Sequence, residues 1–258
     1  MHLGTTMSRA LQQDYYVKKR QKILKELDAF TGIARKVAPS YVDDATITAF
    51  VARARSELEK LLPTLPYVGG DDSPFTRLLI NSAETLAFYR ASKPLKMDPR
   101  RMGQFIYEIA EGYAESLPAY KKRLARWLVF SGRMKRRWSQ ALAESQRHAY
   151  PGNWEGEFIE GDGKTFDYGF NFTECAWLKL VRKEGGAEIA PYVCLCDYAK
   201  MRGVGIGFRR TQTLATGGKL CDFRFVKGGT TPRAWPPEAL TEGQAYWKKR
   251  KSSDAKTH

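Results

Sequence analysis

The sequence of 258 residues is poor in histidine, cysteine and acidic side chains. Of three histidines, His2 and His258 lie at the ends, so His148 is the one candidate for a Cys–His pair. Residues 1–11 lack the apolar core of a signal peptide, and the four cysteines therefore do not predict a disulfide framework. No apolar run approaches the length of a membrane span, so we expect a cytoplasmic protein.

Acidic residues number 28 against 43 lysines and arginines, which gives a formal net charge of +15. This charge is compatible with nucleic acid, membrane surfaces and anionic small molecules as partners. Much of it lies in residues 120–149, a predicted amphipathic helix with nine basic residues and one acid. We expect its stripe, with Leu124, Trp127 and Trp138, to pack on the core, so nucleic acid is not an expected partner. The alternative is a helix that lies on a membrane or on nucleic acid.

Helical periodicity dominates the first half of the chain. The spacing of apolar residues, with prolines at the ends, predicts helices over about 8–36, 43–62, 75–91, 99–116 and 120–149. Asp43 or Asp44 is a suitable N-cap for the second helix. A loop rich in glycine, proline and aspartate, residues 65–74, separates the second helix from the third.

The composition of the sequence changes at Tyr150, after which glycine and alternating aromatic residues become frequent. We predict a hairpin of strands 154–159 and 166–172, a helix capped by Thr173, a helix over 187–201, and strands over 204–213 and 220–226. The fold class is α+β, with a helical N-terminal half packed on a small, mainly antiparallel α+β C-terminal half. The expected regions are 1–150 (helical), 151–230 (α+β, with the Cys/Asp motifs) and 231–258 (a Pro-rich loop and a frayed basic tail).

The last predicted strand sorts its side chains by alternation. Cys221 shares one face with two phenylalanines, while Asp222 and Arg224 share the other. The Asp/Arg pair either forms a structural ion pair or points into a cleft. The strand before it offers Arg209, Arg210, Thr211 and Thr213, which are placed to meet this pair across the turn.

The four cysteines all lie in the last third of the chain. Cys194 and Asp197 are three residues apart and share a helix face, whereas Cys196 does not. Cys175 lies near a predicted helix N-terminus, where we expect a lowered thiol pKa. These thiols are small core residues, nucleophiles or pocket groups. The spacing lacks CxxC pairs and nearby histidines, so no metal site is predicted, and no nucleotide motif predicts a cofactor.

The run from Arg210 to Phe225, with Thr-Leu-Ala before a glycine and then Cys-Asp-Phe-Arg-Phe, resembles the C-terminal signature of the L-2-amino-thiazoline-4-carboxylic acid hydrolase family. Cys194 with Asp197, and the upstream Cys175, match the same family. The resemblance implies an enzyme that opens a small cyclic amidine-thioether, such as L-2-amino-thiazoline-4-carboxylate, to N-carbamoyl-L-cysteine.

This chemistry needs a base, a donor for the ring nitrogen and a cation for the substrate carboxylate. We expect Asp197 or Asp222 as base, Cys194 and Cys221 as nucleophile or pocket thiols, Arg210 or Arg224 as carboxylate clamp, and Thr213 and Cys175 in the substrate pocket. A second hypothesis is a non-catalytic small-molecule-binding or sensor protein on the same scaffold. The oligomeric state is left open.

Overall fold

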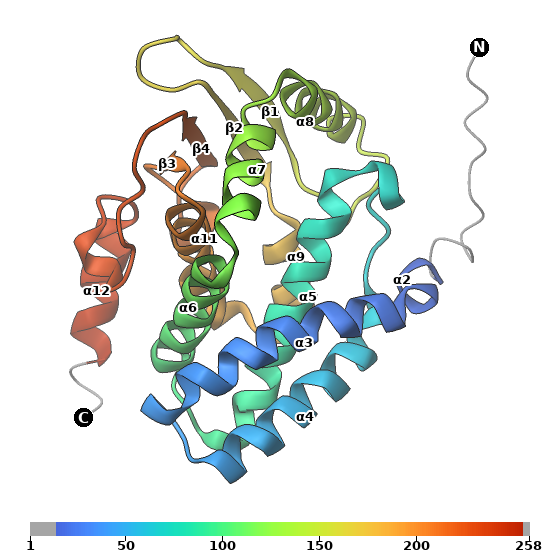
Figure 1. Cartoon of the computed structure of the whole chain (residues 1–258), viewed down its shortest axis with the longest axis vertical. Helices are drawn as coiled ribbons and strands as arrows, with labels where there is room; N and C mark the ends of the chain where they lie inside the picture. The colour runs from blue at the N-terminus through green and yellow to red at the C-terminus, as the bar shows by residue number, and fades with distance from the viewer. Residues whose placement is uncertain (1–13, 255–258) are drawn as a thin grey trace.

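The computed structural model describes residues 14–254 and confirms the α+β class. A small antiparallel sheet lies at one end of the molecule, and α3 (Arg20–Val37) and α4 (Asp44–Leu61) lie at the other end (Figure 1). A continuous core of buried side chains runs from the first described helices to the last one. Within the described residues, no helix is long and apolar enough to cross a membrane.

Most predicted helices of the first half are found within a few residues of their expected ends. They are α2 (Tyr15–Lys18), α3 (Arg20–Val37), α4 (Asp44–Leu61), α5 (Pro74–Ser92), α6 (Pro99–Ser116), α7 (Ala119–Val129) and α8 (Gly132–Ser145). Asp43 caps α4 by accepting a hydrogen bond from the Thr46 N–H at 2.7 Å. The helix expected over 8–36 is interrupted at Lys19, and its residues 8–13 lie outside the described part.

The long basic helix expected over 120–149 is two helices. Ser131 interrupts it, because its Oγ accepts a hydrogen bond from the Met134 N–H at 3.2 Å and so caps α8. Trp138 of α8 packs against Phe170, with ring centroids 4.7 Å apart. Trp127 of α7 is instead exposed. The expectation of a core-packed stripe is therefore correct for α8 and wrong for α7, which has no buried residue.

The sheet has the order β1-β2-β4-β3, and every pairing is antiparallel. Its strands are β1 (Glu155–Glu160), β2 (Tyr168–Glu174), β3 (Gly207–Arg209) and β4 (Cys221–Val226). Phe172 lies opposite Cys221, and Tyr168 lies opposite Phe225. Strand β3 is shorter than the expected 204–213, because Gly205 ends the preceding helix in the left-handed conformation and residues after Arg209 turn away.

Three short helices accompany the sheet: α9 (Ala176–Glu184), α10 (Ala190–Cys194) and α11 (Cys196–Val204). Thr173 does not cap α9, because it is still part of β2, and Cys175 takes the N-cap position. The helix expected over 187–201 breaks at Leu195. This break separates Cys194 from Asp197, so they do not share one continuous helix face.

Part of the segment expected to be a frayed basic tail is helical. Residues Gln244–Asp254 form α12, and Trp247 on this helix is fully buried. Its ring packs against Tyr192 of α10 at 5.3 Å between centroids. Burial of a tryptophan supplies more apolar contact than most residues, which fixes this segment on the body of the protein.

Gly103 makes the close approach of α6 to α10 possible. A Cβ at this position would lie 2.4 Å from the Cβ of Tyr192, so Gly103→Ala should reduce the free energy of unfolding by about 2 kcal/mol. Gly32→Ala is the matched control, because its Cβ would meet nothing within 4 Å and alanine favours helix by about 0.5–1 kcal/mol. Urea unfolding of both variants measures this; equal effects would contradict the packing argument.

Candidate functional site

The residues singled out in the sequence converge where the α10–α11 break meets the start of β4. Cys194 ends α10, Asp197 lies at the start of α11, Cys221 begins β4, and Cys175 precedes α9. Cys194 interacts electrostatically with the other two thiols and with Asp197. Cys221 is buried, while Cys175, Cys194 and Asp197 each keep some accessible surface. We call these four residues the thiol cluster.

Arg210 bonds two members of the thiol cluster from inside the protein. Its Nη1 donates to Asp197 Oδ2 at 3.0 Å, and its Nη2 donates to the Cys194 carbonyl at 2.9 Å. Glu242 takes the other side of the guanidinium in a bidentate pair, at 2.7 Å from Nε and 3.0 Å from Nη2. Tyr198 donates its hydroxyl to Glu242 at 2.8 Å. The Arg210 side chain is only 1% exposed, which favours a positioning role over the expected substrate clamp.

Burial dominates the ionisation of the thiols. It raises the pKa of Cys175 to about 12, although backbone N–H groups of the first turn of α9 lower it. The lowered pKa expected for Cys175 is therefore wrong, because desolvation of the thiolate outweighs the helix N-terminus. Burial also raises the pKa of Cys194 well above its ordinary value, against the opposing influence of Arg210. The pKa of Cys221 is raised for the same reason, so these groups are neutral thiols at pH 7.

Thr213 and Cys221 are brought together by the loop that follows β3. Thr213 Oγ1 lies 3.3 Å from Cys221 Sγ, and the Leu214 N–H donates to the same sulfur at 3.3 Å. Thr213 is itself buried. The loop thus fixes the position of the Cys221 thiol.

Asp222 and Arg224 lie on the opposite face of β4 from Cys221, as alternation predicts. Asp222 accepts hydrogen bonds from the Thr211 N–H at 2.9 Å, the Thr211 hydroxyl at 2.6 Å and the Gln212 N–H at 2.9 Å. Arg224 donates to Asn171 Oδ1 at 2.9 Å and to two backbone carbonyls. The structure therefore does not bring these two residues into the thiol cluster. Asp222 instead holds the loop that carries Arg210 and Thr213.

His148 is not part of the thiol cluster. Its exposed ring bonds Glu155 through Nδ1 at 2.8 Å. The main influences on the pKa values of Cys175, Cys194 and Cys221 include no histidine. Across the described residues, no three His, Cys, Asp or Glu side chains are grouped to hold a metal ion. Asp197 is the carboxylate of the thiol cluster.

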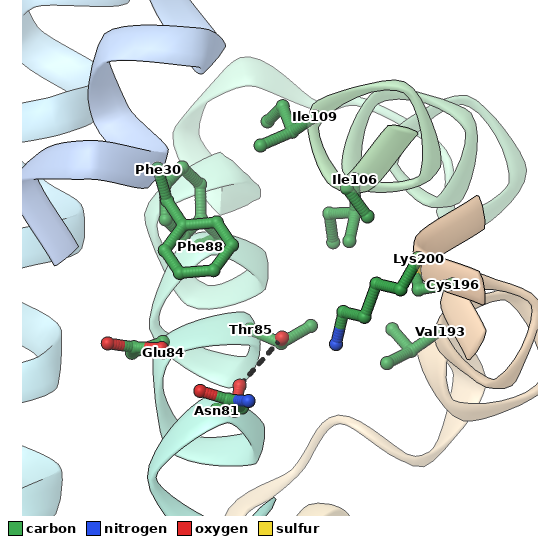
Figure 2. Close-up of a pocket in the computed structure, with 11 residues that line it drawn as sticks. Phe30, Asn81, Glu84, Thr85, Phe88, Ile106, Ile109, Val193, Cys196 and Lys200 are labelled. Atoms are coloured by element: carbon green, nitrogen blue, oxygen red, sulfur yellow. Dashed lines mark hydrogen bonds between the residues drawn. The ribbon is translucent and has the colours of Figure 1, made fainter. Parts of the chain in front are cut away.

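A second polar cluster lines a pocket between α5, α6 and α11. Helix α5 contributes Asn81, Glu84 and Thr85 to its lining. Figure 2 shows the Lys200 side chain extending from α11 toward Thr85. Glu84 is 4% exposed, and its Oε1 has no hydrogen-bond partner among the described residues. The cavity volume is about 50 Å³, room for a few water molecules and far below the several hundred Å³ typical of ligand pockets. Cys196 lines this pocket and is not part of the thiol cluster, consistent with the structural role expected for it.

Sequence reasoning missed Glu84 and Glu242 for different reasons. Glu84 has a local signal, because polar residues 81, 84 and 85 interrupt the buried face of an otherwise apolar helix. Glu242 has none, since it lies in a polar loop 32 residues after Arg210. Only the packing of the chain end on α10 brings it to the guanidinium.

Glu84 should make stability depend on pH. Burial raises its pKa from 4.5 to about 7, so the unfolded chain ionises first and stability falls as pH rises between these values. Glu84→Gln should therefore raise the free energy of unfolding by about 3 kcal/mol at pH 8 and change it little at pH 4. Denaturant unfolding at both pH values tests this. The control is the exposed Asp28→Asn; a pH-independent effect of Glu84→Gln would refute the assignment.

Removal of Glu242 should be far more harmful than removal of a surface carboxylate. Glu242→Ala leaves part of the buried Arg210 charge unpaired, with an expected loss of about 3–5 kcal/mol. Asp28→Ala, which breaks the exposed pair with Arg55, should cost about 0–1 kcal/mol. Thermal and urea unfolding compare them, and similar losses would show that the Arg210–Glu242 pair is dispensable.

The resemblance noted in the sequence is confirmed by comparison with known families. A family model described as L-2-amino-thiazoline-4-carboxylic acid hydrolase matches residues 86–225, more than half of the chain. This range includes the whole thiol cluster and Arg210, and it ends before Glu242. Comparisons with curated proteins and with solved structures give no match. The chain thus belongs to the L-2-amino-thiazoline-4-carboxylic acid hydrolase family.

Proposed function

We propose that this protein is a hydrolase that opens a small cyclic amidine-thioether carrying a carboxylate, such as L-2-amino-thiazoline-4-carboxylate, to N-carbamoyl-L-cysteine. The observation that carries this proposal is the partly exposed Asp197 carboxylate, which Arg210 holds at 3.0 Å beside the Cys194 thiol. These residues stand at positions that match the family motifs, and the family's name is that of a hydrolase.

The proposed reaction begins with attack of water on the ring carbon between sulfur and nitrogen. Asp197 accepts one proton of this water as its oxygen bonds to carbon, and this proton passes to the ring nitrogen. The tetrahedral intermediate then collapses to a urea carbonyl: the carbon–sulfur bond breaks, and the proton of the new hydroxyl group passes to the departing sulfur. Both protons of the water are thus found in the product, one on nitrogen and one on sulfur, and no further reactant is needed.

The state of the thiols favours this route over covalent catalysis. A thiolate at Cys194 is disfavoured by burial, which raises the pKa of its thiol. Neutral thiols at Cys175, Cys194 and Cys221 offer a polarisable wall for a ring that contains sulfur. Attack by Cys194 itself, with Asp197 as its base, is the competing route.

Arg210, Thr213 and Asp222 have positioning roles in this proposal. Arg210 fixes one oxygen of Asp197, Thr213 holds Cys221, and Asp222 holds the loop between them. We assign Arg224 to the support of β2, where its guanidinium bonds Asn171. We place the reaction in the cytoplasm, because all four thiols are free and a reducing compartment keeps them so.

The test is a mass-spectrometric turnover assay with L-2-amino-thiazoline-4-carboxylate, run with and without chelator. Asp197→Asn should lower kcat about 10²–10⁴-fold, as expected for loss of a general base. Cys194→Ala should lower it less than about tenfold if water attacks directly. Asp28→Asn, a carboxylate exposed on α3, is the matched control and should be unchanged.

Other results of this assay are equally informative. A dead Cys194→Ala with a trapped thiol adduct in the wild type would replace the water route by covalent catalysis. Tight binding of the substrate with no product would replace the enzyme by the ligand-binding or sensor protein. Full activity of Asp197→Asn would remove Asp197 from the reaction.

A further inference from the structure

Helix α7 presents its apolar residues to solvent. Tyr120, Leu124, Trp127 and Leu128 are 67%, 52%, 66% and 37% exposed, and within residues 14–250 the other large hydrophobic side chain so exposed is Val17. The spacing of these four residues places them on one stripe of the helix. Concentration of exposed apolar side chains on one helix marks an interaction surface, whereas scattered ones do not.

The opposite side of α7 contacts the protein through Val129, which packs against the core, and through polar bonds. Arg126 Nη1 donates to the Val204 carbonyl at 2.8 Å, and Lys122 Nζ donates to the Glu115 carbonyl at 2.9 Å. The carbonyl of Val129 accepts from the Tyr168 hydroxyl at 3.1 Å. In Figure 1, α7 lies in the foreground with no other element drawn across it. Most of the apolar surface of α7 therefore faces outward, unlike that of an ordinary surface helix, which packs its apolar stripe on the core.

Positive charge borders this stripe on both sides. On a helical wheel, Lys121 flanks Leu128 and Arg123 flanks Trp127, and both basic residues are exposed. Residues 119–129 contain no acid, and α8 begins with the exposed Arg133 and Arg136. A symmetric contact with a second copy would bring these like charges together. Nucleic acid would satisfy the charges but leave two leucines without a favourable partner.

We propose that the outer face of α7 docks this protein onto an anionic lipid bilayer as an interfacial helix. The stripe of Tyr120, Leu124, Trp127 and Leu128 enters the boundary between headgroups and acyl chains, about 5–10 Å deep. Tyrosine and tryptophan are favoured at this depth because one end of each ring is apolar and the other polar. Lys121 and Arg123 extend to the lipid phosphates and carboxylates.

The first experiment is co-sedimentation of the full chain with vesicles of phosphatidylcholine containing about 30% phosphatidylserine. The protein should sediment with these vesicles, be released by salt, and bind pure phosphatidylcholine much more weakly. Leu124→Gln with Trp127→Gln should lower the partition coefficient at least about tenfold. Val17→Gln, at the exposed hydrophobic residue away from α7, is the matched control and should bind as the wild type does.

Charge is tested separately from the apolar stripe. Lys121→Gln with Arg123→Gln should reduce binding to anionic vesicles, while Lys36→Gln with Lys96→Gln, which removes the same charge from exposed positions elsewhere, should not. All these side chains are exposed, so the variants should melt as the wild type does. This pair also decides the question if the Leu124/Trp127 variant fails to fold.

Several outcomes would overturn the proposal. They are equal binding of the Leu124/Trp127 variant and the wild type, equal binding to vesicles with and without phosphatidylserine, and absence of vesicle binding. Salt-sensitive retention of single-stranded DNA that depends on α7, without vesicle binding, would assign the surface to nucleic acid. A concentration-dependent dimer lost in the Leu124/Trp127 variant would assign it to a second copy.

Discussion

A buried guanidinium holds the functional half of this protein together. Arg210 bonds Asp197 and the Cys194 carbonyl on one side and Glu242 on the other, and it is almost inaccessible to water. An unpaired charge in such surroundings costs several kcal/mol, so the loop after β3, the α10–α11 break and the segment before α12 must come together around it. The orientation of Asp197 thus depends on a carboxylate from the far end of the chain.

Burial also decides the protonation state of the thiol cluster. Cys194 and Cys221 lie near the Arg210 cation, yet desolvation keeps the pKa values of these thiols high, as it does for Cys175. Proximity to Arg210 is therefore not enough to create a thiolate, because the guanidinium is already neutralised by two carboxylates. Asp197 keeps access to solvent beside these buried thiols, which is why the proposed reaction uses water as the nucleophile.

The N-terminal half contains two groups in unfavourable surroundings, one buried and polar and the other exposed and apolar. Glu84 lies inside the core, and its Oε1 has no hydrogen-bond partner among the described residues, which lowers the stability of the fold. Helix α7 lies at the surface with its apolar stripe outward, and its cost is exposure of that stripe to water. The break at Ser131 makes this orientation possible, since a single helix over both segments would carry the stripe of Trp138 into the core throughout.

The sequence by itself determined the helices with strong periodicity and caps, such as α6 (Pro99–Ser116), and the alternation that places Cys221 inside and Asp222 outside, because these are local properties. It also carried the family motifs. Only the tertiary structure decided that Arg210 is buried, that Glu242 is its partner and that the Cys175 thiol is neutral, since desolvation and ion pairing depend on what packs around a residue. For the same reason the pattern of residues 120–149 indicated an amphipathic helix, but only the packing of α7 and α8 decided which way each stripe faces.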